Sequence, residues 1–120
     1  MTSYPLFDKS IFQILLTELG PDDVAELLEV FMADTSAKLE ALAARYADRP
    51  TTRREAHAIK SSAGTFGFAE LSGLARELER GAETVSEEQL REFVGALRRS
   101  FDATAAFART KLANVSLETI

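Results

Sequence analysis

Apolar side chains recur every three or four residues along almost the whole chain. This spacing places them on one face of an α-helix, which turns once in about 3.6 residues. No stretch alternates between apolar and polar residues for long enough to form a strand, and the sequence contains no internal repeat or low-complexity segment. The pattern therefore predicts an all-α fold.

Residues that favour the end of one helix and the start of another separate the first two predicted helices. Asp8 precedes the first apolar run as a candidate N-cap. Gly20 suits the position after a helix and Pro21 suits a first turn, so the second helix is expected from there to about Tyr46. The side chains that we expect these two helices to bury are Ile11, Ile14, Leu15, Leu19, Val24, Leu27, Leu28, Phe31, Leu39, Leu42 and Tyr46.

Two further helices are expected in the middle of the chain. Residues 47–50 read as a linker, because the residue before a proline is biased away from helix. The third helix is predicted over residues 51–66, ending at Gly67, and the fourth over residues 69–82.

The last helix opens with Ser86 and Gln89 at the spacing of a capping box, and residues 114–120 are expected to be a frayed tail. Long amphipathic helices with short connections predict an antiparallel four-helix bundle, with the additional short N-terminal helix packed at one end. At 120 residues the chain fits one domain, 1–120, ordered over about 8–113.

The composition excludes several classes of function. Lys and Arg total 14 against 19 Asp and Glu, a net charge of −5, so the chain lacks the basic surface of a nucleic-acid binder. It has no cysteine, which removes disulfides and thiol nucleophiles. No apolar run approaches the roughly 18 residues of a membrane span, and the first residues lack the basic-then-apolar order of a signal peptide. We therefore expect a cytoplasmic protein that binds neither nucleic acid nor membrane.

The only histidine, His57, is the first candidate for chemistry near neutral pH. Ser61 and Gly64 lie within about 40° of it around the predicted helix, and Lys60 lies about 60° to the side. Glycine weakens a helix by about 1 kcal/mol relative to alanine, so a helix that keeps it beside His57 indicates that a partner approaches closely. The apolar side chains that point away from His57, and leave it exposed, are Ala56, Ile59, Ala63 and Phe66.

The charges around His57 suit a phosphorylated imidazole. Lys60, Arg53 and Arg54 lie within one turn of it, and a cation about 4 Å from an anion gains about 1 kcal/mol in water or about 4 kcal/mol at an effective dielectric of 20. The sequence has no phosphate-binding loop or kinase signature for ATP, so a phosphoryl group must come from another protein. The alternative is structural, with a surface histidine on a solvated basic face.

A longer motif surrounds His57. The segment Ala56-His57-Ala58-Ile59-Lys60-Ser61-Ser62-Ala63-Gly64-Thr65-Phe66-Gly67, with Glu70-Leu71 and Leu78-Glu79 after it, resembles the histidine-containing phosphotransfer (HPt) family. That family has His, two residues, Lys, a small-residue stretch, and then an apolar residue and Gly at a turn. With Leu27-Leu28-Glu29-Val30-Phe31 upstream, the resemblance extends over residues 5–113.

The resemblance implies a phosphorelay intermediate rather than an enzyme with turnover. His57 would exchange a phosphoryl group with an aspartate of a receiver domain, Lys60 would stabilise the transferred charge, and Gly67 would end the active helix. No cofactor or metal site is implied in this chain, which shows no acidic cluster dedicated to a metal beside His57, and any Mg²⁺ would belong to the receiver. Ser61 replaces a glycine that is usual in the family, and its hydroxyl could affect the transfer rate.

The expected partners are receiver domains of hybrid histidine kinases and of response regulators, bound by a monomer. Docking is expected over the small residues of the His57 face, with basic flanks and apolar contacts near it. The candidate docking residues are Arg53, Arg54, Ser61, Gly64 and Phe68, with Met32 as a further apolar candidate.

Two other classes of protein stay open. One is an interaction module that docks a receiver or kinase without being phosphorylated, although such a module has no need of His57 and Lys60. The other is the dimerisation and phosphoacceptor part of a histidine kinase. In that class an acidic residue usually follows the histidine, whereas Ala58 follows His57 here.

Overall fold

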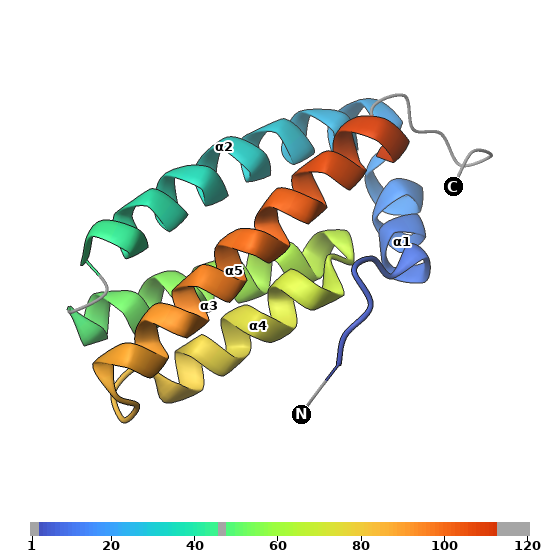
Figure 1. Cartoon of the computed structure of the whole chain (residues 1–120). Coiled ribbons are helices and arrows are strands. Elements are labelled where there is room, and N and C mark those ends of the chain that lie inside the picture. The colour runs from blue at the N-terminus through green and yellow to red at the C-terminus, as the bar shows by residue number, and fades with distance from the viewer. Residues whose placement is uncertain (1–2, 46–47, 113–120) are drawn as a thin grey trace.

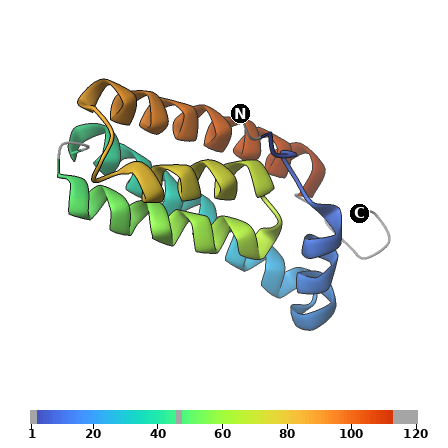
Figure 2. The same cartoon turned by 90° about the horizontal axis from the view of Figure 1, so that it is seen from below.

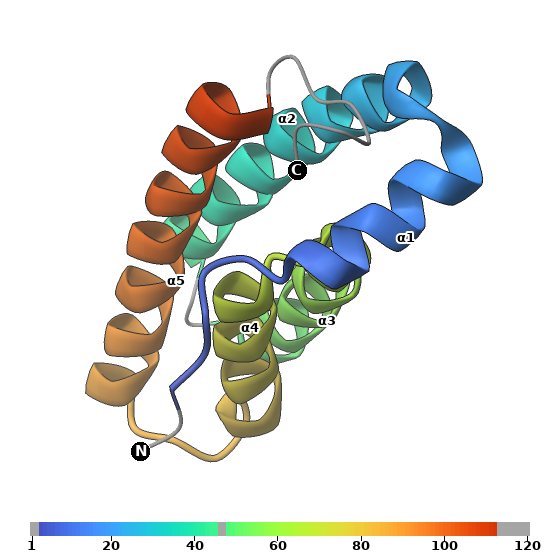
Figure 3. The same ribbon diagram turned by 90° about the vertical axis from the view of Figure 1, so that its right-hand side faces the viewer.

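The computed structural model describes residues 3–45 and 48–112, and within these ranges it contains helices and no strand. Helices α2–α5 run antiparallel to their neighbours as a four-helix bundle, and α1 lies across one end (Figure 1, Figure 3). The predicted all-α fold and bundle architecture are confirmed. The elements are α1 (Lys9–Leu19), α2 (Pro21–Arg45), α3 (Arg49–Phe66), α4 (Ala69–Gly81), α5 (Glu87–Phe107) and a π-helical turn, η1 (Ala108–Leu112).

The hydrophobic core runs along the inside of the bundle. Each large aliphatic side chain buried there contributes about 1.5–3 kcal/mol of hydrophobic stabilisation. The α3–α4 pair packs side by side along its length, as Figure 2 shows from below. The most deeply buried aliphatic side chains are Leu16, Val24, Leu39, Leu42, Ile59, Leu71, Leu78, Leu90, Leu97 and Leu112.

Most of the predicted helix boundaries are confirmed. The Asp8 carboxylate accepts hydrogen bonds from the backbone N–H groups at the start of α1. Gly20, with φ of 84°, ends α1, and Pro21 begins α2. At the start of α5, Ser86 and Gln89 form the reciprocal capping box, with both hydrogen bonds at 3.1 Å.

The predicted buried face of α1 is confirmed at Leu15 and wrong at the other three positions. Phe12, Leu15 and Leu16 are buried, whereas Ile11, Ile14 and Leu19 are exposed. Because α1 lies across the end of the bundle, only a narrow stripe of it contacts α2 and α3. Leu27 on α2 was also expected in the core and is exposed, because it lies at the edge of the buried stripe.

The predicted linker 47–50 is also partly wrong, because α3 begins at Arg49 and includes Pro50. A proline is tolerated in a first helical turn, where its missing N–H has no intrahelical partner. Asp48 caps this turn, and the Arg49 guanidinium donates 2.6 Å to the Val85 carbonyl, which ties the start of α3 to the α4–α5 loop. The predictions for Tyr46 and for residues 114–120 lie outside the described residues.

Candidate functional site

His57 lies in the middle of α3 and points out of the bundle. Its side chain is 59% exposed, whereas Ala56, Ile59 and Ala63 on the opposite side of the helix are fully buried. The predicted orientation is therefore confirmed. It follows from the helical period alone, because the buried stripe of α3 leaves the other face to solvent.

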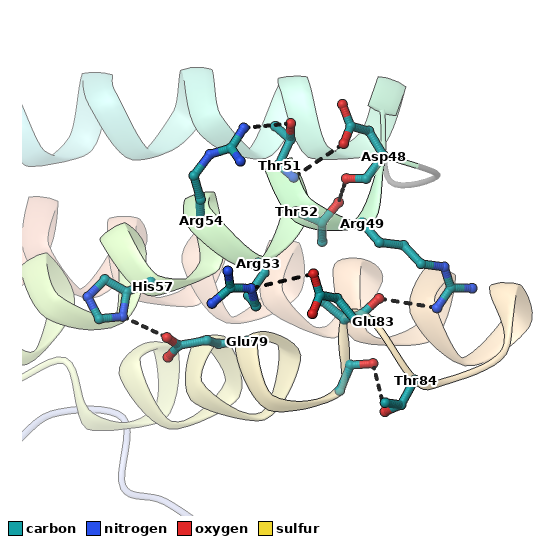
Figure 4. Close-up of polar contacts among 12 residues, drawn as sticks. Asp48, Arg49, Thr51, Thr52, Arg53, Arg54, His57, Glu79, Glu83 and Thr84 are labelled. Carbon is teal, nitrogen blue, oxygen red and sulfur yellow. Dashed lines mark hydrogen bonds and ion pairs between the residues drawn. The ribbon is translucent and has the colours of Figure 1, made fainter.

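Glu79 of α4 points toward His57 on the neighbouring helix α3 (Figure 4). Its Oε2 atom lies 2.7 Å from His57 Nδ1, and its Oε1 atom lies 2.9 Å from Lys60 Nζ. One carboxylate thus contacts both side chains that the sequence analysis singled out for chemistry. The Ser72 hydroxyl donates 2.8 Å to the Lys60 carbonyl and holds α4 close to α3 at this point.

The electrostatics of the site decide which nitrogen of His57 is free. The hydrogen bond from Lys60 is the largest effect that lowers the pKa of Glu79; partial burial opposes it, and the hydrogen bond with His57 adds to the lowering. Glu79 is therefore an anion near neutral pH and can only accept hydrogen bonds. His57 Nδ1 must donate to it, so a neutral ring carries its lone pair on Nε2, which points away from Glu79 (Figure 4).

The two arginines before His57 face different ways. Arg53 lies toward the turn that follows α4, where its Nε is 3.7 Å from Glu83 and both side chains are half exposed. Arg54 donates 3.0 Å to the Thr51 hydroxyl on its own helix (Figure 4). Neither contacts the His57 ring in this arrangement, so the three predicted cations lie along the helix rather than around the imidazole.

Ser61 and Gly64 lie on the His57 face, as predicted. Ser61 is exposed and Gly64 is half-buried. A Cβ atom on Gly64 would lie 3.4 Å from Ser72 Oγ, so the glycine also allows close packing of α4. The small side chain at 64 therefore has a structural reason besides any approach of a partner.

Phe68 is not a docking residue. It is fully buried, where its ring packs at 5.5 Å from Phe31 and 5.8 Å from Phe66, because the turn after α3 directs it into the core. Met32 is also displaced from the His57 face and lines a groove between α2 and α5.

Gly67 ends α3 in the left-handed conformation, with φ of 83°. A side chain there would clash, because its Cβ atom would lie 2.5 Å from the Asp8 carbonyl oxygen. The Asp8 N–H also donates 2.6 Å to the Gly67 carbonyl, which joins the start of α1 to the end of the His57 helix. Its place in the structure fits the helix-ending role that the family resemblance implies.

Glu79 is the residue that sequence reasoning missed. The segment Leu78-Glu79 belongs to the motif that resembles the family, but the sequence pattern assigns no role to the carboxylate. A signal was present: Leu78 is buried, and the next residue lies about 100° away around the helix, at the edge of the packed face. Glu79 contacts His57, which lies 22 residues earlier on another helix. This contact could be predicted only by knowing how α4 is aligned along α3.

The described residues offer no metal centre. Within residues 3–45 and 48–112, no three side chains of the metal-binding types come together to hold an ion. Over these ranges, no helix is long and apolar enough to cross a membrane. The chemistry available at the site is that of an exposed imidazole, a carboxylate and an ammonium group.

Comparisons with known proteins agree on one family. The model of the Hpt domain family matches residues 26–107. The chain is 31% identical over 96 residues to the phosphorelay protein LuxU of Vibrio vulnificus strain YJ016, covering 78% of this chain and 84% of LuxU, and matches LuxU of strain CMCP6 equally well.

A solved structure shares the fold. The crystal structure of histidine-containing phosphotransfer protein B (HptB) from Pseudomonas aeruginosa PAO1 superposes with a TM-score of 0.84, over 95% of this chain and 100% of HptB. At 22% sequence identity, the likeness establishes the architecture of the bundle.

Proposed function

This chain belongs to the Hpt domain family and is a histidine phosphotransfer protein of a phosphorelay, so we propose that its only histidine, His57, carries the phosphoryl group. One observation carries the proposal. His57 Nδ1 is held 2.7 Å from Glu79 while the side chain is 59% exposed. The ring is thus oriented by the protein and open to a partner, and Nε2 is the nitrogen that would react.

The proposed step begins at an aspartyl phosphate of a receiver domain. The Nε2 lone pair of His57 attacks phosphorus, the new N–P bond forms, and the P–O bond to the aspartate breaks with its electron pair left on the carboxylate. No proton leaves Nε2, because the ring proton is on Nδ1 and stays in the hydrogen bond to Glu79. The ring gains positive charge as the bond forms, and the Glu79 anion opposes that charge.

Lys60 is proposed to stabilise the phosphoryl group itself. Its Nζ atom lies 2.9 Å from Glu79 Oε1 and its side chain is 30% exposed, so the ammonium is anchored beside the reacting ring. Phosphoryl transfer depends mainly on positioning and on neutralising the charge of the oxygens. Arg53 and Arg54 would add a more distant positive field.

The partners in this proposal are receiver domains of hybrid histidine kinases and of response regulators. The chain acts as a carrier, since it forms and breaks its own covalent intermediate, and any Mg²⁺ needed is bound by the receiver. Its monomeric state and its place in the cytoplasm stay predictions, which sedimentation and cell fractionation would test.

The test is labelling with a radioactive phosphoryl group. The protein should not label with ATP alone, should label when a phosphorylated receiver is added, and should lose the label in acid but keep it in alkali. An aspartyl or glutamyl phosphate would be lost in alkali, and a serine ester would survive acid, so this pattern identifies a phosphoramidate.

His57→Gln should abolish the labelling, whereas Glu92→Gln, an exposed substitution on α5, should leave it unchanged. The melting temperature of His57→Gln should stay near the wild-type value, because an exposed side chain seldom contributes more than about 0.5 kcal/mol. Labelling of His57→Gln, or a label that survives acid, would contradict the proposal and favour the docking module that is not phosphorylated.

A further inference from the structure

Contacts between α3 and α4 recur at matched positions along the two helices, which pack side by side (Figure 2). Glu79 lies 2.7 Å from His57. Ser72, seven residues before Glu79, lies opposite Gly64, which is seven residues after His57. Because the helices are antiparallel and seven residues make about two turns, both contacts lie on the same edge of each helix, about 10 Å apart. The alignment of α4 at Ser72 is therefore the alignment that brings Glu79 to His57.

The same alignment continues beyond the histidine. Arg53, four residues before His57, lies 3.7 Å from Glu83, which follows Glu79 by four residues in the turn after α4 (Figure 4). Both side chains of this pair are half exposed, and an exposed ion pair contributes little to holding two helices together. The hydrogen bond of Ser72 is partly buried, so it restrains the two helices more effectively than this surface pair.

The Ser72 hydroxyl joins α4 to the backbone of the histidine helix. It donates 2.8 Å to the carbonyl of Lys60. Gly64 leaves room for this approach, because even a Cβ atom at that position would lie 3.4 Å from Ser72 Oγ. A hydrogen bond weakens steeply when its length or angle departs from the optimum, so this one resists both sliding and rotation of α4. Its acceptor belongs to the same lysine whose ammonium group pairs with Glu79.

Glu79 depends on this alignment because its carboxylate reaches two atoms at once. One oxygen lies 2.7 Å from His57 Nδ1 and the other lies 2.9 Å from Lys60 Nζ. A displacement of about 1 Å within a reactive site can lower a rate by about 100-fold. The turn that joins the helices at Gly67 is ten residues from His57, about 15 Å along α3. Ser72 restrains α4 between that turn and the site.

We propose that Ser72 is a positioning residue for phosphoryl transfer: its hydrogen bond to the Lys60 carbonyl aligns α4 so that Glu79 holds the reacting ring. This proposal rests on the proposed function of His57. Ser72 touches none of the reacting atoms and acts only through Glu79. Without its hydroxyl, the carboxylate contacts His57 Nδ1 for a smaller fraction of the time. The proton of the neutral ring then spreads over both nitrogens, and the reactive lone pair is less often on Nε2.

The first test compares Ser72→Ala with Ser100→Ala. The Ser100 hydroxyl on α5 donates 2.8 Å to Glu70 on α4, so it is a matched hydrogen bond between helices on the side of α4 away from His57. Both variants should unfold at lower urea concentration, because each loses a partly buried hydrogen bond. Only Ser72→Ala should lower kcat for transfer from a receiver, by about 3- to 10-fold with KM unchanged, since the carboxylate is displaced and not removed. Its rate with phosphoramidate, a small donor that needs no docking surface, should fall by the same factor.

The second test follows the proton of the His57 ring by ¹⁵N NMR at pH 9. It should be on Nδ1 in the wild type and in Ser100→Ala, and shared between both nitrogens in Ser72→Ala. Ser72→Thr keeps a hydroxyl donor and should restore both the wild-type spectrum and kcat. In a Glu79→Ala background, Ser72→Ala should lower kcat by less than about twofold, because the group through which it acts is gone.

The outcomes separate this proposal from the one on which it rests. A Ser72→Ala protein that is less stable but keeps the wild-type kcat and ring proton would assign the hydrogen bond to stability alone and overturn the proposal. An equal loss of kcat in the Glu79→Ala background would overturn it too, because Ser72 would then act by another route. If neither a receiver nor phosphoramidate phosphorylates His57 in the wild type, the proposed function fails. The spectra need no phosphoryl transfer, so they still decide whether Ser72 aligns Glu79 with the ring.

Discussion

Replacing Glu79 with Gln removes the negative charge beside His57 and Lys60 while keeping the size and hydrogen-bonding shape of the side chain. The Gln oxygen can still accept from Nδ1, at the place where Glu79 Oε2 now lies at 2.7 Å. The variant therefore isolates the charge of the carboxylate from its role in orienting the ring.

The size of the effect follows from the geometry. Two unit charges about 4 Å apart interact by about 1 kcal/mol in water and about 4 kcal/mol at an effective dielectric of 20. His57 is 59% exposed and Glu79 is 20% exposed. Solvent screening therefore places the interaction energy that Glu79→Gln removes near the lower of these two values, at about 1–2 kcal/mol. At about 1.4 kcal/mol per factor of ten, kcat for transfer from a receiver should fall about 5- to 30-fold, with KM unchanged.

Rapid-quench transfer from a labelled receiver gives kcat and KM, and ¹⁵N NMR of the His57 ring at pH 9 reports which nitrogen holds the proton. Glu83→Gln is the matched control, because Glu83 lies four residues after Glu79, in the turn that follows α4, and pairs with Arg53 at a longer 3.7 Å. It should change kcat by less than about twofold. If Glu79→Gln transfers at the wild-type kcat, the carboxylate charge does not act on the reacting ring. If the wild-type proton is on Nε2, the assignment of the nucleophilic nitrogen is wrong.

Three further predictions concern the same face. Lys60→Ala should slow transfer by about tenfold or more with little change in circular dichroism, since lysine and alanine both favour helix; an unchanged rate would remove Lys60 from the mechanism. Because Lys60 holds the pKa of Glu79 below its ordinary value of 4.5, ionised Glu79 stabilises the fold above that pH and loses this contribution as the pH falls through the lowered value. In urea unfolding, the stability difference between wild type and Glu79→Gln should thus shrink between pH 5 and pH 3; a constant difference would contradict the linkage. Gly67→Ala should lower the free energy of unfolding by about 2 kcal/mol or more, because its backbone has φ of 83° and its Cβ atom would meet the Asp8 carbonyl; a loss below about 1 kcal/mol would show that the turn relaxes.

The helices and most of their ends could be predicted from the sequence, because both depend on local interactions. The caps at Asp8 and Ser86 act on backbone groups two or three residues away, and Gly20 and Gly67 act through their own φ angles. The outward direction of His57 is equally local, since the buried stripe of one helix determines its exposed face.

Apart from the linker at 47–50, where Pro50 lies in the first turn of α3, the failed predictions concern contacts between helices. Phe68 was expected at the surface, but the turn that follows Gly67 directs it into an aromatic cluster with rings from α2 and α3. On α1, the apolar residues could form more than one stripe, and the position of the helix across the bundle end decided that Phe12 rather than Ile14 is buried.

By itself, therefore, the sequence determined an exposed histidine on an amphipathic helix with small residues and a lysine beside it. Only the tertiary structure decided that Glu79 joins His57 and Lys60. Residues 57 and 79 lie on different helices, and their contact depends on how far α4 slides and turns against α3. That register is set by the packing of many side chains between the two helices, including the close approach of Gly64 and Ser72. It cannot be predicted from the apolar periodicity of either helix alone.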